Sequence, residues 1–215
     1  MEITDLKKLE KLPYFTKNAL RSLVEESDNT LNQSVKRFLA VNKIFKIKNG
    51  VYVTERFYLE NKSNGKYLEY LSFVLKPNSY LSIDYVLSKF NVITDATYGF
   101  YSMTTNGTIK YKNVFGSYSY KNIKNELFTG FKEEYFLNNK YYIATKAKAL
   151  FDYLYLRQSI INLDSNNLIE DLRLNLASFA KADINEFTGY SKLLKKDNSK
   201  IVSIVKKIEN EYVNI

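Results

Sequence analysis

Cysteine, histidine and tryptophan are all absent from this sequence. Without cysteine no disulfide framework can form, which favours a protein of a reducing compartment. Without cysteine and histidine the chain cannot build the usual zinc sites, a cysteine–histidine pair or a serine–histidine–aspartate triad. Any catalysis would have to rest on carboxylate, lysine or tyrosine chemistry.

Long apolar runs are also absent. No stretch approaches the roughly 18 residues that a membrane-spanning helix needs, and the first twelve residues lack the apolar segment of a signal peptide. We therefore expect a soluble, cytoplasmic protein without membrane contact. A chain of 215 residues favours one small module followed by a domain of about 100–150 residues.

The net charge of +9 suggests a polyanionic partner. However, the abundance of lysine, asparagine, isoleucine and tyrosine is also what an AT-rich genome would impose by codon usage. The distribution of charge is more informative than its sum. No acid occurs from Asn29 to Thr54, where five cations stand, whereas the first 28 residues hold six acids.

Three short helices followed by a hairpin are predicted within residues 1–56. Apolar spacing predicts helices over 2–12, 17–26 and 31–42, with a turn at 27–30. Asn49-Gly50 then separates two β-branched runs, 44–48 and 51–53, and this pair suits a type I′ hairpin turn. This order predicts a winged helix-turn-helix, and so binding to double-stranded DNA.

The third helix is expected to face the DNA. Leu31, Val35, Phe38, Leu39 and Asn42 fall on one arc, which we expect to be buried, and the opposite arc is polar or small. The residues predicted to contact DNA lie on that helix and on the hairpin: Asn32, Gln33, Lys36, Arg37, Lys43, Lys46, Lys48 and Asn49. Lys46 and Lys48 are expected to share one face of their strand. Two alternatives remain, a helical bundle with a solvated basic face and a winged helix used for protein contact.

The remainder of the chain predicts an α+β domain. A polar linker is expected at 57–66 and the domain at 67–215, with a small antiparallel sheet flanked by helices. Asn106-Gly107 is a second hairpin signal. The elements expected are helices at 67–75, 83–90, 145–156, 165–177, 183–194 and 199–212, and strands at 98–105, 108–115, 117–121, 127–131 and 135–143.

This second region resembles the AbiEi family of type IV antitoxins. The resemblance rests on YLSIDYVL at 80–87, SMTT at 102–105, FGSYSY at 115–120, ELFTG at 126–130 and, most specifically, IATKAKALFDYLY at 143–155. It runs in register from the N-terminal module to about residue 157. The chain departs from the family at Lys146-Ala147, where relatives usually have Pro-Glu. Proline suits the first position of a helix, so its loss would weaken the cap but leave the fold.

The resemblance implies an antitoxin that represses its own operon by binding promoter inverted repeats. It also implies that the protein counteracts a nucleotidyltransferase-like toxin in a phage-defence, or abortive-infection, system. Contact with the toxin would be functional and possibly physical, and the protein would be a monomer in solution or a dimer on DNA. The alternative is a plain winged-helix regulator whose second domain dimerises or senses a ligand.

An enzymatic role finds little support. The only E-x-K spacing of a metal-dependent nuclease is Glu60-Asn61-Lys62, and a charged loop explains it better. Tyrosines of the expected sheet resemble a base-stacking platform, but ordinary packing accounts for them better. Asp152 is expected to make a structural hydrogen bond. We expect no catalytic residue, no metal site and no cofactor.

Overall fold

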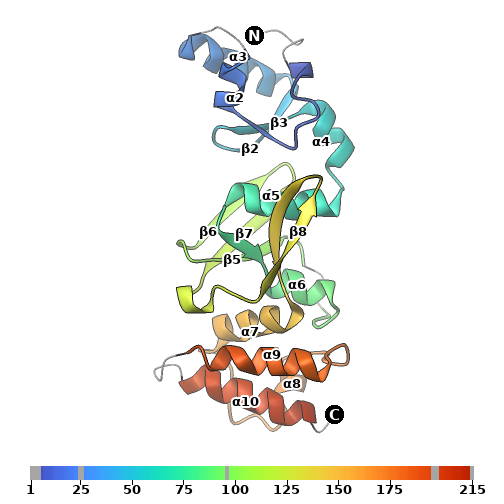
Figure 1. Cartoon of the computed structure of the whole chain (residues 1–215), viewed down its shortest axis with the longest axis vertical. Coiled ribbons are helices and arrows are strands. Elements are labelled where there is room, and N and C mark those ends of the chain that lie inside the picture. The colour runs from blue at the N-terminus through green and yellow to red at the C-terminus, as the bar shows by residue number, and fades with distance from the viewer. Residues whose placement is uncertain (1–5, 24–26, 95–96, 195–198, 214–215) are drawn as a thin grey trace.

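The computed structural model describes residues 6–23, 27–94, 97–194 and 199–213, and the side chain of Ser199 lies outside that description. It has an α+β architecture in which two units follow one another along the long axis, with the two chain ends at opposite poles (Figure 1). Each unit is built around its own sheet. Among the described residues, no helix has both the length and the apolar character needed to cross a membrane.

The first unit contains a three-stranded antiparallel sheet with the strand order β1-β3-β2. Residues 6–12 turn through bonds such as that from Leu9 N to Leu6 O at 2.9 Å. A small core of Leu6, Leu20, Leu31, Phe38 and others holds the helices on the sheet. Its elements are β1 (Phe15–Thr16), α2 (Lys17–Arg21), α3 (Asp28–Ala40), β2 (Ile44–Lys48) and β3 (Val51–Thr54).

Helix boundaries in this unit follow their caps. The Thr16 hydroxyl accepts a hydrogen bond from Ala19 N at 3.2 Å and begins α2, as predicted. The Ser27 hydroxyl accepts one from Thr30 N at 3.3 Å, so α3 begins within the stretch expected to be a turn. Asn42, expected on the buried arc, is exposed beyond the helix with φ 55°. The predicted helical positions 2–5 and 24–26 lie outside the described residues.

The linker expected at 57–66 is wrong, because this segment is mostly helical. The Thr54 hydroxyl caps α4 (Glu55–Asn61), and Asn64 caps α5 (Gly65–Leu75). Phe57 is buried, and its ring centroid lies 5.2 Å from that of Tyr67. The main hydrophobic core therefore continues from the β2–β3 hairpin, through residues such as Val53, into the second unit.

The second unit is built on a six-stranded mixed sheet, larger than the small antiparallel sheet expected. Its order is β6-β7-β5-β4-β9-β8. Because β7 pairs in parallel with β5 and separates it from β6, Asn106-Gly107 closes no hairpin between neighbours. The strands are β4 (Ser79–Leu81), β5 (Phe100–Thr104), β6 (Ile109–Asn113), β7 (Gly116–Asn122), β8 (Phe131–Phe136) and β9 (Asn139–Ala144).

Helices of the second unit lie on the sheet and at the far end of the molecule. α6 (Ile83–Lys89) follows β4, and α7 (Lys146–Arg157) lies between the sheet and the terminal helices (Figure 1). Those terminal helices are α8 (Leu168–Asp171), α9 (Lys181–Ser191) and α10 (Ser199–Val213). The helix expected at 165–177 is thus a single turn. The strand expected at 127–131 is wrong: a 3-10 turn, η1 (Asn125–Leu127), occupies its start.

The residues that carry the family resemblance meet in a buried ion-pair network. Asp152 Oδ1 accepts from Lys148 Nζ at 2.7 Å, and Oδ2 accepts from Ser82 Oγ at 2.7 Å and Tyr80 OH at 3.0 Å. Both charged side chains have no exposed surface. Burial raises the pKa of Asp152 and lowers that of Lys148, while their ion pair opposes both shifts. The network joins β4 to α7, and Asp152 makes the structural hydrogen bonds expected of it.

A second buried carboxylate, Glu69 of α5, is held by three donors. Tyr85 OH, Tyr141 OH and Lys89 Nζ each lie 2.6 Å from its oxygens. Burial alone would raise the pKa of Glu69, but the bonds from Lys89, Tyr141 and Tyr85 outweigh it and leave the pKa below its usual value.

This lowered pKa predicts an acid-dependent loss of stability. A carboxylate with a depressed folded pKa stabilises the protein above its unfolded pKa of about 4.3, and the contribution is lost as the pH falls through the folded pKa. Glu69→Gln should therefore be less stable than the wild type at neutral pH, and the gap should narrow in acid. Urea unfolding of both proteins across this range measures the gap. A gap that stays constant would contradict the account.

Candidate nucleic-acid interface

The outward face of α3 is polar and cationic. Asn32, Gln33, Lys36 and Arg37 are exposed on it, together with Ala40. The inward face, which includes Leu31, Val35 and Phe38, is buried as predicted. The guanidinium of Arg37 lies 5.2 Å from the centre of the Phe38 ring. Helix packing thus turns amide and cationic groups toward solvent.

The β2–β3 hairpin forms as predicted and begins beside α3. Gly50 has φ 74°, the left-handed conformation that the turn requires, and its carbonyl accepts from Lys17 N at 3.0 Å. Lys46 and Asn49 are exposed on this hairpin. The hairpin therefore presents one cation and one amide to solvent near its tip.

Lys48 does not share the exposed face of Lys46, so that expectation is wrong. The strand pairing slips by one residue: Lys46 faces Tyr52, whereas Lys48 faces Val51. This bulge turns Lys48 toward the second unit. Its Nζ donates to the carbonyl oxygens of Val74 at 2.8 Å and Leu75 at 3.0 Å. Burial, reinforced by the nearby charge of Lys76, lowers the pKa of Lys48.

Lys43 is also engaged within the protein. Its Nζ lies 2.8 Å from Glu55 Oε2, and both side chains are partly exposed. This pair supplies an acid for one of the five cations of the acid-free stretch. Lys36, Arg37 and Lys46 form no ion pair that the described part of the structure shows with a carboxylate. These three carry the positive charge of the surface made by α3 and the hairpin.

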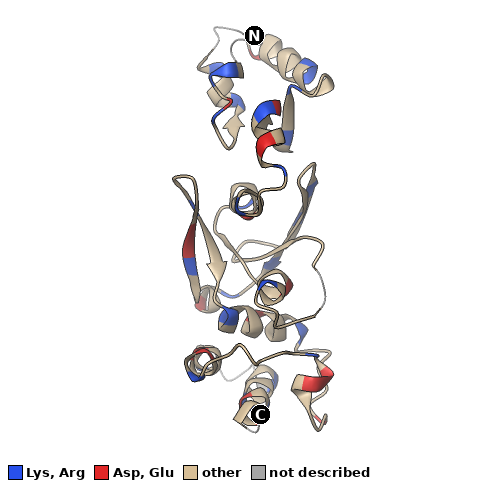
Figure 2. Ribbon diagram, turned by 90° about the vertical axis from the view of Figure 1, so that its right-hand side faces the viewer, with Lys and Arg blue, Asp and Glu red and all other residues tan. Residues whose placement is uncertain are grey.

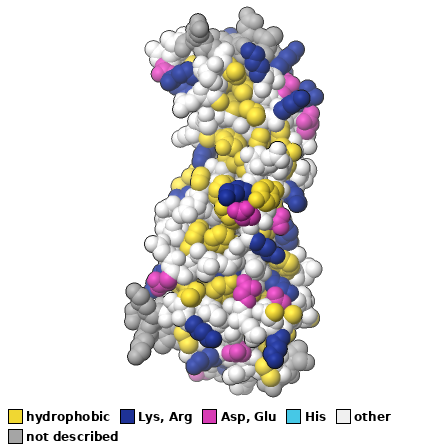
Figure 3. Space-filling model, viewed as in Figure 1, with side chains coloured by type: hydrophobic (Ala, Val, Ile, Leu, Met, Phe, Trp, Pro, Cys, Tyr) yellow, Lys and Arg dark blue, Asp and Glu magenta, His cyan; other side chains and the backbone are white. Residues whose placement is uncertain are grey.

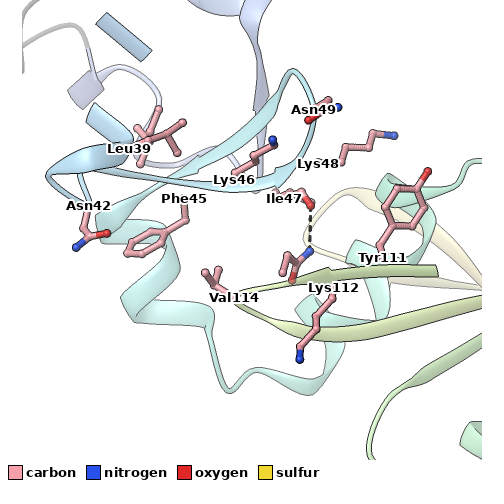
Figure 4. Close-up of a pocket in the computed structure, with 12 residues that line it drawn as sticks. Leu39, Asn42, Phe45, Lys46, Ile47, Lys48, Asn49, Tyr111, Lys112 and Val114 are labelled. Carbon is pink, nitrogen blue, oxygen red and sulfur yellow. Dashed lines mark hydrogen bonds between the residues drawn. The ribbon is translucent and has the colours of Figure 1, made fainter. Parts of the chain in front are cut away.

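A groove of about 630 Å³ separates the hairpin from β6 of the second unit (Figure 4). It runs from the end of α3, at Leu39, along β2 to the edge strand. Asn113 Nδ2 donates to Ile47 O at 3.1 Å across it, the bond drawn dashed in Figure 4. None of the residues lining it is acidic, and Lys46 and Lys112 extend from its two walls. We call it the hairpin groove.

The contribution of β6 was not predicted from the sequence. Lys110 and Lys112 are exposed on this edge strand, and the half-buried Tyr111 between them packs edge-on against Tyr120 at 5.9 Å. The alternation in IKYKN, with lysines at every second position, is the signal that marks one exposed cationic face. Basic side chains thus stand on both units (Figure 2), and the surface narrows between them (Figure 3).

The chemistry of this surface is that of binding. Ammonium, guanidinium and amide groups donate hydrogen bonds to phosphates and base edges. Within the described residues no group of three carboxylate side chains is placed to hold a metal ion. Comparison with protein-family models and with curated proteins found no match for this chain.

Proposed function

We propose that the first unit is a winged helix-turn-helix and that the protein binds double-stranded DNA in a sequence-specific manner. The observation that carries this proposal is the outward face of α3, where Gln33, Lys36 and Arg37 stand exposed beside a hairpin that carries Lys46. The strand order β1-β3-β2, with two helices between β1 and β2, supports it. In such a module the last helix enters the major groove.

The dimensions suit this mode of binding. The 13 residues of α3 make a rod about 20 Å long, which a major groove about 12 Å wide admits. Gln33 suits adenine, and Arg37 suits guanine, because each offers paired hydrogen-bonding groups to those base edges. Lys46 on the wing, the name we give the β2–β3 hairpin from here on, would contact a phosphate, as would Lys112 beyond the hairpin groove.

The target that we propose is a promoter inverted repeat upstream of the chain's own gene. One winged helix offers only a handful of contacts, so two copies on a repeat would be needed for useful affinity. The protein would then be a monomer in solution and a pair on DNA, acting as a repressor of its operon.

Base readout and phosphate anchoring can be separated by substitution. Gln33→Ala and Arg37→Ala should each weaken operator binding by about 1–3 kcal/mol and relax base preference. Lys46→Ala should weaken binding to the operator and to a shuffled duplex alike. Fluorescence anisotropy with both duplexes measures this. If Lys46→Ala changed sequence preference while the α3 variants did not, the proposed docking would be reversed.

For the second unit we propose the antitoxin role that the AbiEi resemblance implies. Its support is the buried network of Tyr80, Ser82, Lys148 and Asp152, because the residues that carry the resemblance also hold this unit together. A nucleotidyltransferase-like toxin would be the partner. The competing proposal is a plain regulator whose second unit dimerises or senses a ligand.

Co-expression distinguishes these two roles. The full chain with Lys36→Ala and Arg37→Ala should lose repression yet still relieve growth arrest by a nucleotidyltransferase-like toxin encoded beside its gene. We expect rescue equal to that of the wild type when both genes have an unrelated promoter. If the variant fails to rescue at equal protein level and equal melting temperature, the protection comes from transcription alone and the regulator reading holds.

A further inference from the structure

We propose that Lys48 is a positioning residue that orients the winged helix through the C-terminal end of α5, and that operator recognition therefore depends on the second unit. This inference rests in part on the proposed function, because it concerns how the same surface is presented to DNA. The positioning claim itself can be tested without DNA.

The ammonium of Lys48 is placed as a helix cap. It donates to two successive carbonyl oxygens, Val74 O and Leu75 O, in the last turn of α5. Carbonyl groups at this end of a helix lack helical partners and carry partial negative charge, so a cation stabilises them. A charged side chain of the wing thus satisfies backbone groups of the other unit.

Further contacts hold the same junction from other sides. Asn113 of β6 donates to Ile47 O at 3.1 Å, one residue before Lys48. Tyr67 of α5 donates to Pro13 O at 2.7 Å from a buried position. The Phe45 and Tyr58 rings stack with centroids 4.1 Å apart. The wing is consequently clamped between α5 and β6, with little freedom to swing.

This arrangement divides two lysines of one strand between two roles. Lys46 is exposed and would contact DNA, whereas Lys48 faces inward because of the bulge. If the wing is held by Lys48, then its loss should loosen the first unit relative to the second while leaving the DNA-facing cations in place. A phosphate-contacting lysine would behave in the opposite way.

The absence of cysteine allows clean distance labelling. Spin labels at Asn18→Cys on α2 and Lys132→Cys on β8, both exposed positions, report the separation of the two units by pulsed electron resonance. We expect a narrow distance distribution in the otherwise wild-type chain and a clearly broader one after Lys48→Met. Lys48→Arg should restore it, because a guanidinium also donates to two carbonyls. Lys46→Met should leave it narrow.

Binding to DNA supplies the second arm. Lys48→Met should weaken operator binding with an unchanged salt slope, whereas Lys46→Met should reduce that slope by about 0.9. An unchanged distance distribution in folded Lys48→Met would overturn the positioning role. A reduced salt slope in Lys48→Met would overturn it as well, by making Lys48 a phosphate contact. If the wild type bound no DNA, the proposed function would fail, while the distance measurement would still decide the positioning claim.

Discussion

Replacement of Asp152 with alanine is expected to lower the free energy of unfolding by about 3–5 kcal/mol, because it leaves a fully buried ammonium without its partner. The carboxylate accepts from Lys148, Ser82 and Tyr80, and none of its surface reaches solvent. The loss would therefore strand one charge and two hydroxyl groups in the core.

Chemical denaturation followed by circular dichroism measures this loss. Asp164→Ala is the matched control, since Asp164 is exposed and should change stability by no more than about 0.5 kcal/mol. Adding Lys148→Met to Asp152→Ala should recover part of the loss, because the stranded charge is then gone. A cost below about 1 kcal/mol for Asp152→Ala would mean that the ion pair does not hold β4 to α7.

The affinity for operator DNA should fall about 10³–10⁵-fold between roughly 50 mM and 200 mM salt, if two copies together make about 6–10 phosphate contacts. Lys36, Arg37 and Lys46 in each copy, with Lys110 and Lys112 beyond the hairpin groove, provide enough exposed cations for that number. Each neutralised phosphate releases condensed counterions, so every contact steepens the dependence on salt.

A titration by anisotropy at several salt concentrations gives the slope. Lys112→Ala should lower it, because β6 borders the hairpin groove. Lys181→Ala, at an exposed position of the distant α9, is the control and should not change it. A flat response in the wild type would remove electrostatic DNA binding from the account.

The N-terminal elements were largely predictable because their signals are local. A threonine cap, an apolar stripe in α3 and Asn49-Gly50 each act over a few residues, and the structure places all three where the pattern indicated. What failed was the boundary to the second unit. A polar stretch at 57–66 was taken as a linker, although Thr54 and Asn64 cap helices on either side of it.

The sheet of the second unit shows the limit of such local signals. Asn106-Gly107 indicates a tight reversal, but nothing in its neighbourhood encodes that β7 pairs between the two strands it joins. The short strand β4 was missed because three residues carry no usable periodicity. Both features depend on contacts between segments far apart in the chain.

Within the candidate interface, the α3 residues were placed correctly and the wing residues only in part. Asn32, Gln33, Lys36 and Arg37 are exposed, as helical spacing requires. Strand alternation assigned Lys48 to the same side as Lys46, but a bulge between them changes its direction. Bulges leave no clear sequence signal when glycine is absent from the bulged strand.

Cross-linking from α3 to DNA tests the central claim most directly. A photoreactive group attached at Ala40→Cys, exposed on the outward face of α3, is compared with one at Ile160→Cys, an exposed site on the second unit. The account predicts efficient, salt-sensitive cross-linking to operator DNA from position 40 and almost none from position 160. Equal yields from both positions, or a higher yield from position 160, would contradict it.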